Sequence, residues 1–256
     1  MSGCVRECAG APERRAPNDT TAVREVIDRS LGCEPFSLRL LRAEAGRSAA
    51  RETGPSEELL FVLGGSGRMI AGDGEHELET ETGALLPAGA RYALHNEGPE
   101  DLLIVAVALH DPLRGDRDAD ALTSLSRLAD QMAQSATGER QFRIVFDPDN
   151  GCHSATQFVG YIPVGAAPAH YHLYDEVIYV LDGTGVMHMN ASRTPLHAGS
   201  AIHLPARKLH TLANSGPGVM RVLGVFRPAG SPAAAFYPDG TPAYTADAPQ
   251  IATIST

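Results

Sequence analysis

The sequence predicts an all-β protein made of two tandem β-barrels joined by a linking helix. Two apolar runs, at 58–63 and 176–181, have the length of strands, and a Gly-x-Gly turn follows each of them. The 256 residues include 26 glycines and 18 prolines, as a protein with many tight turns requires. A chain of this length can hold two small domains, each with its own core.

A pattern of residues in the second half of the chain recurs in the first half at a constant offset of 118 positions. Each matched pair keeps its residue type, and no gap is needed between matches. The repeated residues of the first half are Glu58, Gly65, Gly67, Pro87, Asn96, Gly98 and Pro99. This repeat indicates that a duplication produced two copies of one barrel.

The segments outside the barrels carry weaker signals. The small, polar N-terminus is expected to have little order up to about Asp19, and Thr20 or Thr21 to cap a short helix that runs through Ile27. Helical spacing predicts a linking helix between the barrels, from Ala119 to Gln134; its apolar residues are Leu122, Leu125, Leu128 and Met132. The predicted boundaries are a flexible N-terminal segment at 1–33, a first barrel at 34–110, a helical linker at 111–140, a second barrel at 141–230 and a C-terminal tail at 231–256.

The second copy contains four residues whose spacing is typical of a metal site: His170, His172, Glu176 and His210. Residues two apart on a strand share a face, so both histidines and the glutamate at even separation can point to one place. A later strand must bring His210. Three imidazoles and one carboxylate suit a divalent first-row metal, and no thiolate takes part.

These residues resemble the two characteristic motifs of the cupin superfamily, whose small jelly-roll-like β-barrels hold a metal on three histidines and a glutamate. The match has two departures. Cupins usually have one more residue between Gly165 and His170, and they have glycine where Arg207 stands. The resemblance implies a bicupin with a metal-binding C-terminal barrel and a degenerate N-terminal barrel.

The first copy lacks the histidines, because Glu52, Gly54 and Tyr92 stand at the three corresponding positions. Glu58 alone is retained, and one carboxylate cannot hold a transition metal. We expect a structural barrel without a metal. The alternative is a pocket in which Glu52, Glu58 and Tyr92 bind a small polar ligand.

Further residues of the second copy are candidates for the pocket. Tyr174 shares the parity of the ligands, so its hydroxyl is a candidate catalytic group for proton transfer or substrate orientation; the alternative is a turn residue. Ile178 is expected in the apolar floor. A carboxylate clamp, if there is one, is expected to come from Arg193, Arg221 or Arg227.

The net charge of −10, with no basic stripe, argues against nucleic acid as a partner. No apolar stretch is long enough to cross a bilayer, so no membrane partner is expected. The four cysteines show no paired spacing, which favours a cytoplasmic protein. The expected partner is a small-molecule substrate, and the chain is expected to be a monomer or a homodimer.

An enzyme is the expected function, with one divalent metal, Fe(II) or Mn(II) before Zn or Ni. Four protein ligands leave two positions of an octahedral ion for a substrate such as a keto, enol or hydroxy acid. Oxygenase chemistry, as in dioxygenase-like cupins, is favoured because Ile, Val and Met residues form apolar walls. The alternatives are a Lewis-acid isomerase, a decarboxylase, lyase or aminohydrolase, and a cupin that only binds or senses a small molecule.

Overall fold

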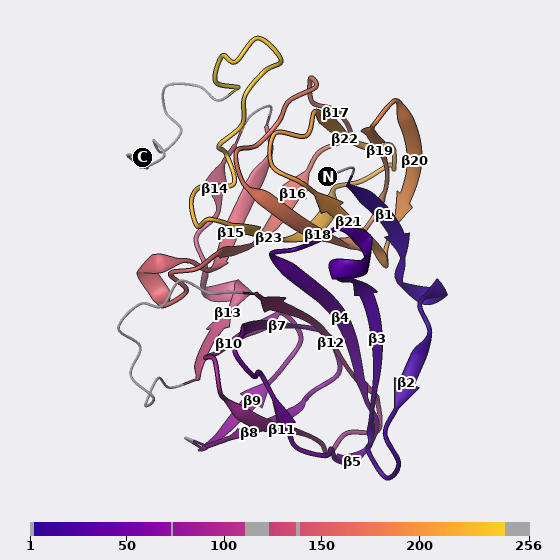
Figure 1. The fold of residues 1–256 in the computed structure, drawn as a ribbon, viewed down its shortest axis with the longest axis vertical. Helices are drawn as coiled ribbons and strands as arrows, with labels where there is room; N and C mark the ends of the chain where they lie inside the picture. Colours follow the sequence, from indigo (N-terminus) through magenta and orange to yellow (C-terminus); the bar gives the residue numbers. More distant parts are fainter. Residues whose placement is uncertain (1–2, 73, 111–122, 137–138, 244–256) are drawn as a thin grey trace. The chain divides into compact units, whose positions relative to one another are not determined.

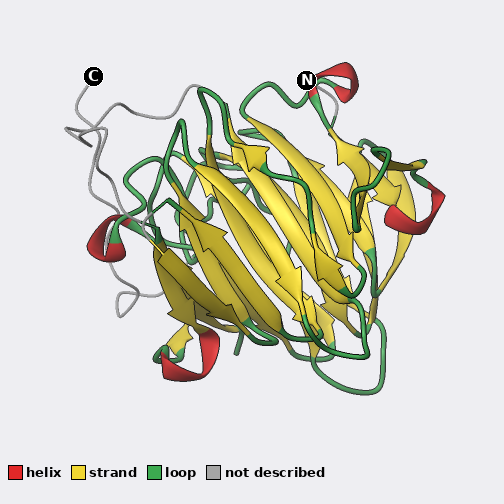
Figure 2. Cartoon of the chain, turned by 90° about the horizontal axis from the view of Figure 1, so that it is seen from below, coloured by secondary structure: helices red, strands yellow, loops and turns green. Residues whose placement is uncertain are grey.

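A computed structural model describes residues 3–72, 74–110, 123–136 and 139–243. Strands dominate these residues, and their helical residues are confined to four single 3-10 turns (Figure 2). None of the helices in these segments is long or apolar enough to cross a membrane. The four turns are η1 (Cys8–Gly10), η2 (Arg29–Leu31), η3 (Leu128–Asp130) and η4 (Pro148–Asn150).

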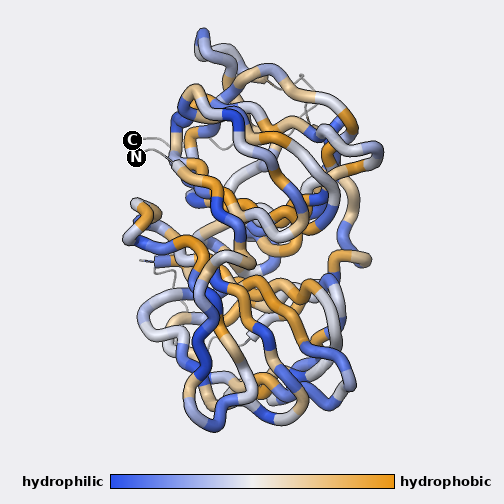
Figure 3. Tube along the Cα trace, turned by 90° about the vertical axis from the view of Figure 1, so that its right-hand side faces the viewer, coloured by the Kyte–Doolittle hydropathy of each residue, from blue (hydrophilic) through white to orange (hydrophobic). Residues whose placement is uncertain are grey.

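The chain divides into two compact units, each of which is a barrel of two antiparallel sheets (Figure 1). The first barrel is Cys8–Asp130, and the second is Gln131–Thr256 with the N-terminal Met1–Glu7. The prediction of an all-β fold with two barrels is therefore confirmed. Residues two apart on a strand share a face, and such pairs belong to the core cluster of each unit, for example Leu60 with Val62 and Ile178 with Val180. Figure 3 shows hydrophobic stretches in many parts of the chain and hydrophilic residues at many turns.

In the first barrel, a seven-stranded sheet has the order β13-β10-β7-β12-β4-β3-β2, and a smaller sheet has the order β5-β11-β8-β9 with β6 also paired to β11. The strands are β2 (Glu13–Arg15), β3 (Thr21–Ile27), β4 (Phe36–Ala43), β5 (Gly46–Arg47), β6 (Arg51–Glu52), β7 (Glu57–Gly64), β8 (Gly67–Ala71), β9 (Gly74–Leu78), β10 (Thr82–Leu86), β11 (Arg91–Asn96), β12 (Leu102–Leu109) and β13 (Ser124–Arg127).

In the second barrel, the large sheet has the order β1-β21-β18-β23-β16-β15-β14, and the small one β17-β22-β19-β20. The strands are β1 (Cys4–Glu7), β14 (Gln134–Ser135), β15 (Gln141–Phe146), β16 (Thr156–Ile162), β17 (Gly165–Ala166), β18 (Asp175–Asp182), β19 (Thr184–Met189), β20 (Ser192–His197), β21 (Ser200–Leu204), β22 (His210–Asn214) and β23 (Met220–Arg227).

The first strand of each repeat pairs with the barrel of the other repeat. β1 pairs with β21 in the second barrel, from Cys4↔His203 to Glu7↔Ser200. β13, its counterpart, pairs with β10 in the first barrel. The order β1-η1-β2-β3 matches β13-η3-β14-β15, so the duplication extends upstream of the motif seen in the sequence.

Two predicted helices are wrong where the structure describes them. Instead of a flexible segment with a short helix, the N-terminal residues form β1, β2 and β3, and β3 covers the predicted helix. Four β-branched residues among the seven of β3 favour the strand, and pairing with β4 fixes it. Part of the predicted linking helix, at 119–122, lies outside the described residues, and the rest begins as β13 and η3. The apolar residues of the predicted helix do not share one buried face, because Leu128 is in the core while Met132 is 82% exposed.

A buried asparagine closes the same turn in both barrels. The Asn214 side chain donates to the carbonyls of Ile162 (2.8 Å) and Gly218 (2.7 Å) and accepts from the Gly216 amide (2.9 Å). Asn96 makes the matching bonds to Ala43, Glu100 and Gly98. These bonds explain why asparagine and glycine recur together in the repeat.

Replacing Asn214 by alanine is expected to lower the free energy of unfolding of the second barrel by about 2 kcal/mol, because three buried backbone groups lose their partners. Asn96→Ala should cause a similar loss in the first barrel. Scanning calorimetry, with separate assignment of the two transitions, measures both. Changes below about 0.5 kcal/mol in the two variants would contradict this role.

Candidate metal centre

The three predicted histidines meet where the loop between β17 and β18 passes β22. His170 and His210 form an isolated antiparallel bridge, with backbone hydrogen bonds of 3.0 and 2.9 Å in the two directions. The sequence predicts His172 on a strand. In the structure it follows His170 in the same loop, outside any regular strand. The bridge holds the two histidine backbones together directly.

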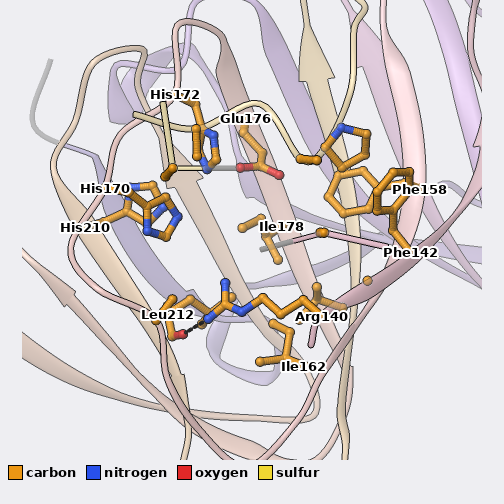
Figure 4. Close-up of a pocket in the computed structure, with 18 of the residues that line it drawn as sticks. Arg140, Phe142, Phe158, Ile162, His170, His172, Glu176, Ile178, His210 and Leu212 are labelled. Carbon is orange, nitrogen blue, oxygen red and sulfur yellow. Dashed lines mark hydrogen bonds between the residues drawn. The ribbon is translucent and has the colours of Figure 1, made fainter. Parts of the chain in front are cut away.

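The side chains of His170, His172 and His210 form one cluster, in which the potential ligand atoms all lie within 4.8 Å of one another. Their ring centroids are separated by 4.6 to 5.1 Å. Figure 4 shows the three rings at one side of a pocket. The sequence prediction that these histidines come together is therefore in agreement with the structure.

Backbone carbonyls select the tautomer of each histidine. The Nδ1 atoms lie 2.8 Å from the Pro168 carbonyl, 2.7 Å from that of Ala234 and 2.9 Å from that of Lys208, for His170, His172 and His210 in turn. A carbonyl can only accept, so each Nδ1 carries the proton and each Nε2 keeps its lone pair. Hydrogen bonds from the ring nitrogen that does not face the metal orient histidine ligands in this way in metal sites.

Burial also keeps the histidines neutral. It lowers the pKa of His210 to about 4, lowers that of His172 well below its usual range and lowers that of His170 as well. A metal ligand must be deprotonated, so the cluster is ready to coordinate at neutral pH. Three neutral imidazoles with free Nε2 atoms fit a divalent first-row metal ion.

Glu176, on β18, lines the same pocket but does not belong to the histidine cluster. Its Oε1 is directed towards β23, 3.1 Å from the place that a Cβ on Gly224 would take. Burial raises the pKa of this carboxyl to about 8, which favours the neutral acid when no metal ion balances its charge. Its role as a fourth ligand stays a prediction.

Tyr174 is buried rather than placed in an exposed turn. Its ring stacks between those of His172 (4.7 Å between centroids) and Phe226 (4.0 Å). It lines the pocket, and burial raises the pKa of its hydroxyl well above the usual value, so the hydroxyl keeps its proton at neutral pH. Its catalytic role stays a prediction.

The pocket beside the histidines has a volume of about 100 Å³ and mostly apolar walls. The walls include Phe142, Phe158, Ile162, Ile178, Leu212 and Val222. The first part of the C-terminal tail also contributes, because Phe236 stacks on Tyr171 and exchanges backbone hydrogen bonds with it. The prediction that the tail is held against a surface agrees with the structure up to residue 243; 244–256 lie outside the described residues.

A cationic side chain that the sequence prediction missed also lines this pocket. This side chain is Arg140, the residue directly before β15. The boundaries predicted from the sequence place it at the end of the linker. The predicted clamp residues Arg193, Arg221 and Arg227 do not line it. Arg221 instead lies 5.7 Å over the Tyr161 ring. No motif marks Arg140, because only the β14–β15 hairpin brings it to the pocket.

In the first barrel, an arginine stands where the second has an apolar wall. Glu58 is paired with Arg39 and accepts a hydrogen bond from the Tyr92 hydroxyl (3.0 Å). In the strand registers Arg39 faces Ala106, and Phe158 faces the equivalent Gly224, so the two side chains are counterparts. A guanidinium thus balances the glutamate in the first barrel. Glu52 is exposed near Arg91, so the predicted alternative of a shared Glu52–Glu58–Tyr92 pocket is wrong.

Comparison with known proteins agrees with this architecture. The chain resembles a glyoxylate-induced protein of Pseudomonas aeruginosa (20% identity, TM-score 0.73, covering 88% of each chain) and the protein Ylba from E. coli (14%, 0.74, covering 89% and 91%). It also resembles a mutant of Bacillus subtilis oxalate decarboxylase (17%, 0.69, covering 90% of this chain and 78% of that one). At these identities the likeness concerns the fold.

Among curated proteins no sequence matches. The family described as "Cupin domain", however, matches twice, at residues 39–108 and 157–226, once in each barrel. These two segments make up more than half of the chain. The protein therefore belongs to the cupin superfamily, as a member with two cupin domains in tandem.

Proposed function

We propose that this protein is a metal-dependent enzyme that converts a small keto, enol or hydroxy acid in the pocket of the second barrel. The observation that carries the proposal is the cluster of three buried, neutral histidines beside an apolar pocket. Their Nε2 atoms are available, and backbone carbonyls hold each ring in place. A purely structural histidine cluster would have no need of three free Nε2 atoms in one place.

His170, His172 and His210 would hold the metal, with Glu176 as the proposed fourth ligand. A divalent Fe or Mn ion at this place supplies Lewis-acid polarisation and redox chemistry with dioxygen. The apolar side chains of the wall exclude water and position an organic substrate. The Tyr174 hydroxyl, which keeps its proton at neutral pH, is suited to donate a hydrogen bond to a substrate oxygen.

Oxygenase chemistry is our first choice because the pocket walls are mostly apolar. Protein purified without chelator or affinity nickel is expected to contain about one equivalent of Fe or Mn. Protein reconstituted with the metal is expected to consume oxygen when it is given at least one acid from a panel of keto, enol and hydroxy acids. Elemental analysis and an oxygen electrode give the two readouts. No metal after reconstitution would contradict the proposal and favour a protein that only binds a small molecule.

A second candidate is Lewis-acid chemistry without oxygen, such as isomerisation, decarboxylation or hydrolysis. The observation that favours it is that the Tyr174 hydroxyl, which keeps its proton at neutral pH, belongs to a side chain that lines the pocket beside the histidines. Proton transfer to a substrate carbon or leaving group requires such a donor. Turnover of the same acids under anaerobic conditions, followed by NMR, would establish this candidate in place of the oxygenase.

A further inference from the structure

Arg140 reaches into the pocket from the β14–β15 hairpin, and its side chain is anchored there. Its Nη2 donates a hydrogen bond of 2.7 Å to the carbonyl of Leu212, which lies on β22 two residues after His210. In Figure 4 the side chain extends along one side of the pocket and this bond joins its end to Leu212. The guanidinium is therefore fixed to the same strand that presents a candidate metal ligand.

The guanidinium and the histidines belong to the same pocket. Arg140, His170, His172 and His210 all line it, and the carbonyl that anchors Arg140 lies on the strand that begins at His210. A small molecule in the pocket can thus face the guanidinium and the histidine cluster at the same time. The predicted clamp residue Arg193, in contrast, is exposed on β20.

Arg140 differs from the other well-buried arginines in its surroundings. Arg39 is paired with Glu58, and Arg51 with Asp19 at 3.0 Å. Among the described residues no carboxylate forms an ion pair with Arg140, and burial lowers the pKa of its guanidinium. Taking a cation out of water without an anion is costly, and an anion in the pocket would offset that cost.

One hydrogen bond to a carbonyl uses only part of the hydrogen-bonding capacity of a guanidinium. The group carries five N–H donors in a planar fork, and the bond to Leu212 uses one nitrogen. A carboxylate matches two neighbouring donors of such a fork in a bidentate pair. Among the lining residues that the structure describes, Arg140 is the one Lys or Arg side chain, so it is the cationic partner that the pocket offers to a carboxylate.

We propose that Arg140 binds the carboxylate of the substrate, and that the substrate is a short-chain oxo or hydroxy acid whose second oxygen faces His170, His172 and His210. The class of substrate rests on the proposed function; the carboxylate site rests on Arg140 itself. The pocket of about 100 Å³ sets the size. A cavity of about 150 Å³ holds benzene, which has six non-hydrogen atoms, so this smaller pocket sets that size as the upper limit for the acid.

The test compares carboxylates with their uncharged amides on manganese-loaded protein. Calorimetry measures the binding of pyruvate and pyruvamide, glycolate and glycolamide, and lactate and lactamide to the wild type, Arg140→Gln and the control Arg193→Gln. The wild type and the control are expected to bind at least one acid about tenfold or more tightly than its amide. In Arg140→Gln this preference is expected to disappear, with metal content and amide binding unchanged.

A carboxylate preference that persists in Arg140→Gln, or its absence in metal-loaded wild type, would overturn the proposal. If Arg140→Gln does not fold, Arg140→Lys decides: a loss of about fivefold in carboxylate affinity supports a bidentate site, and an unchanged affinity refutes it. The same titrations without metal separate the two proposals. Protein that takes up no manganese but keeps an Arg140-dependent preference for carboxylates would refute the enzyme and retain the anion site.

Discussion

Replacing His172 by alanine is expected to lower the metal affinity of the second barrel by at least about 100-fold. The reason is geometric: His172 supplies one of three Nε2 atoms in the cluster, and its ring is oriented by the Ala234 carbonyl. Two imidazoles cannot replace the lost donor. Elemental analysis of protein loaded with Fe or Mn, followed by desalting, measures the retained equivalents.

His188→Ala is the matched control, because His188 is an exposed histidine on β19 of the same barrel and does not belong to the cluster. It should retain the metal of the wild type. Circular dichroism should show both variants folded. Equal metal retention in His172→Ala and wild type would refute the site, and a parallel Glu176→Ala measurement would show whether the carboxylate is a fourth ligand.

Arg39→Leu is expected to destabilise the first barrel by about 3 kcal/mol, because Glu58 would be left as a buried carboxylate without its cation. Glu58 has a side chain that is only 2% exposed, and Arg39 is its ion-pair partner. Scanning calorimetry measures the transition of the first barrel. The double variant Arg39→Leu/Glu58→Leu should recover most of the loss, because it removes both charges.

Arg68→Leu provides the control in the same barrel. Arg68 pairs with Glu75 and Glu97, but all three side chains are at least 41% exposed. Exposed pairs of this kind contribute less than about 1 kcal/mol. If Arg39→Leu were as mild as Arg68→Leu, the pair of Arg39 with Glu58 would not stabilise the first barrel through its buried charges.

The two barrels differ in how they balance one glutamate that both retain. In the first barrel the counterpart of Phe158 is Arg39, whose guanidinium reaches Glu58, and the Tyr92 hydroxyl fills the position of His210. In the second barrel Phe158 offers no charge, and none of the described residues forms an ion pair with the buried Glu176. A metal ion would supply that positive charge. A bound metal ion and a neighbouring arginine would thus be two solutions to one electrostatic problem.

The sequence predicted the parts of the structure that repeat or that carry a side-chain pattern. The 118-residue offset identified two barrels, and the spacing of His170, His172 and His210 identified the cluster. The linking helix failed because leucines at positions three apart also occur on a short strand followed by a 3-10 turn, and pairing with β10 decides between them. Arg140 could not be found, because its place depends on a hairpin and not on a motif.

The exchange of β1 and β13 bears on how this chain arose. A polypeptide with a single repeat that kept these pairings would place its first strand on the β21 or β10 equivalent of a second copy. It would complete its barrel by lending that strand to a second copy and borrowing one in return. Fusion of two such copies turns a concentration-dependent assembly into an intramolecular one. In a fused chain, each half can change its chemistry while its barrel still contains the first strand of the other repeat.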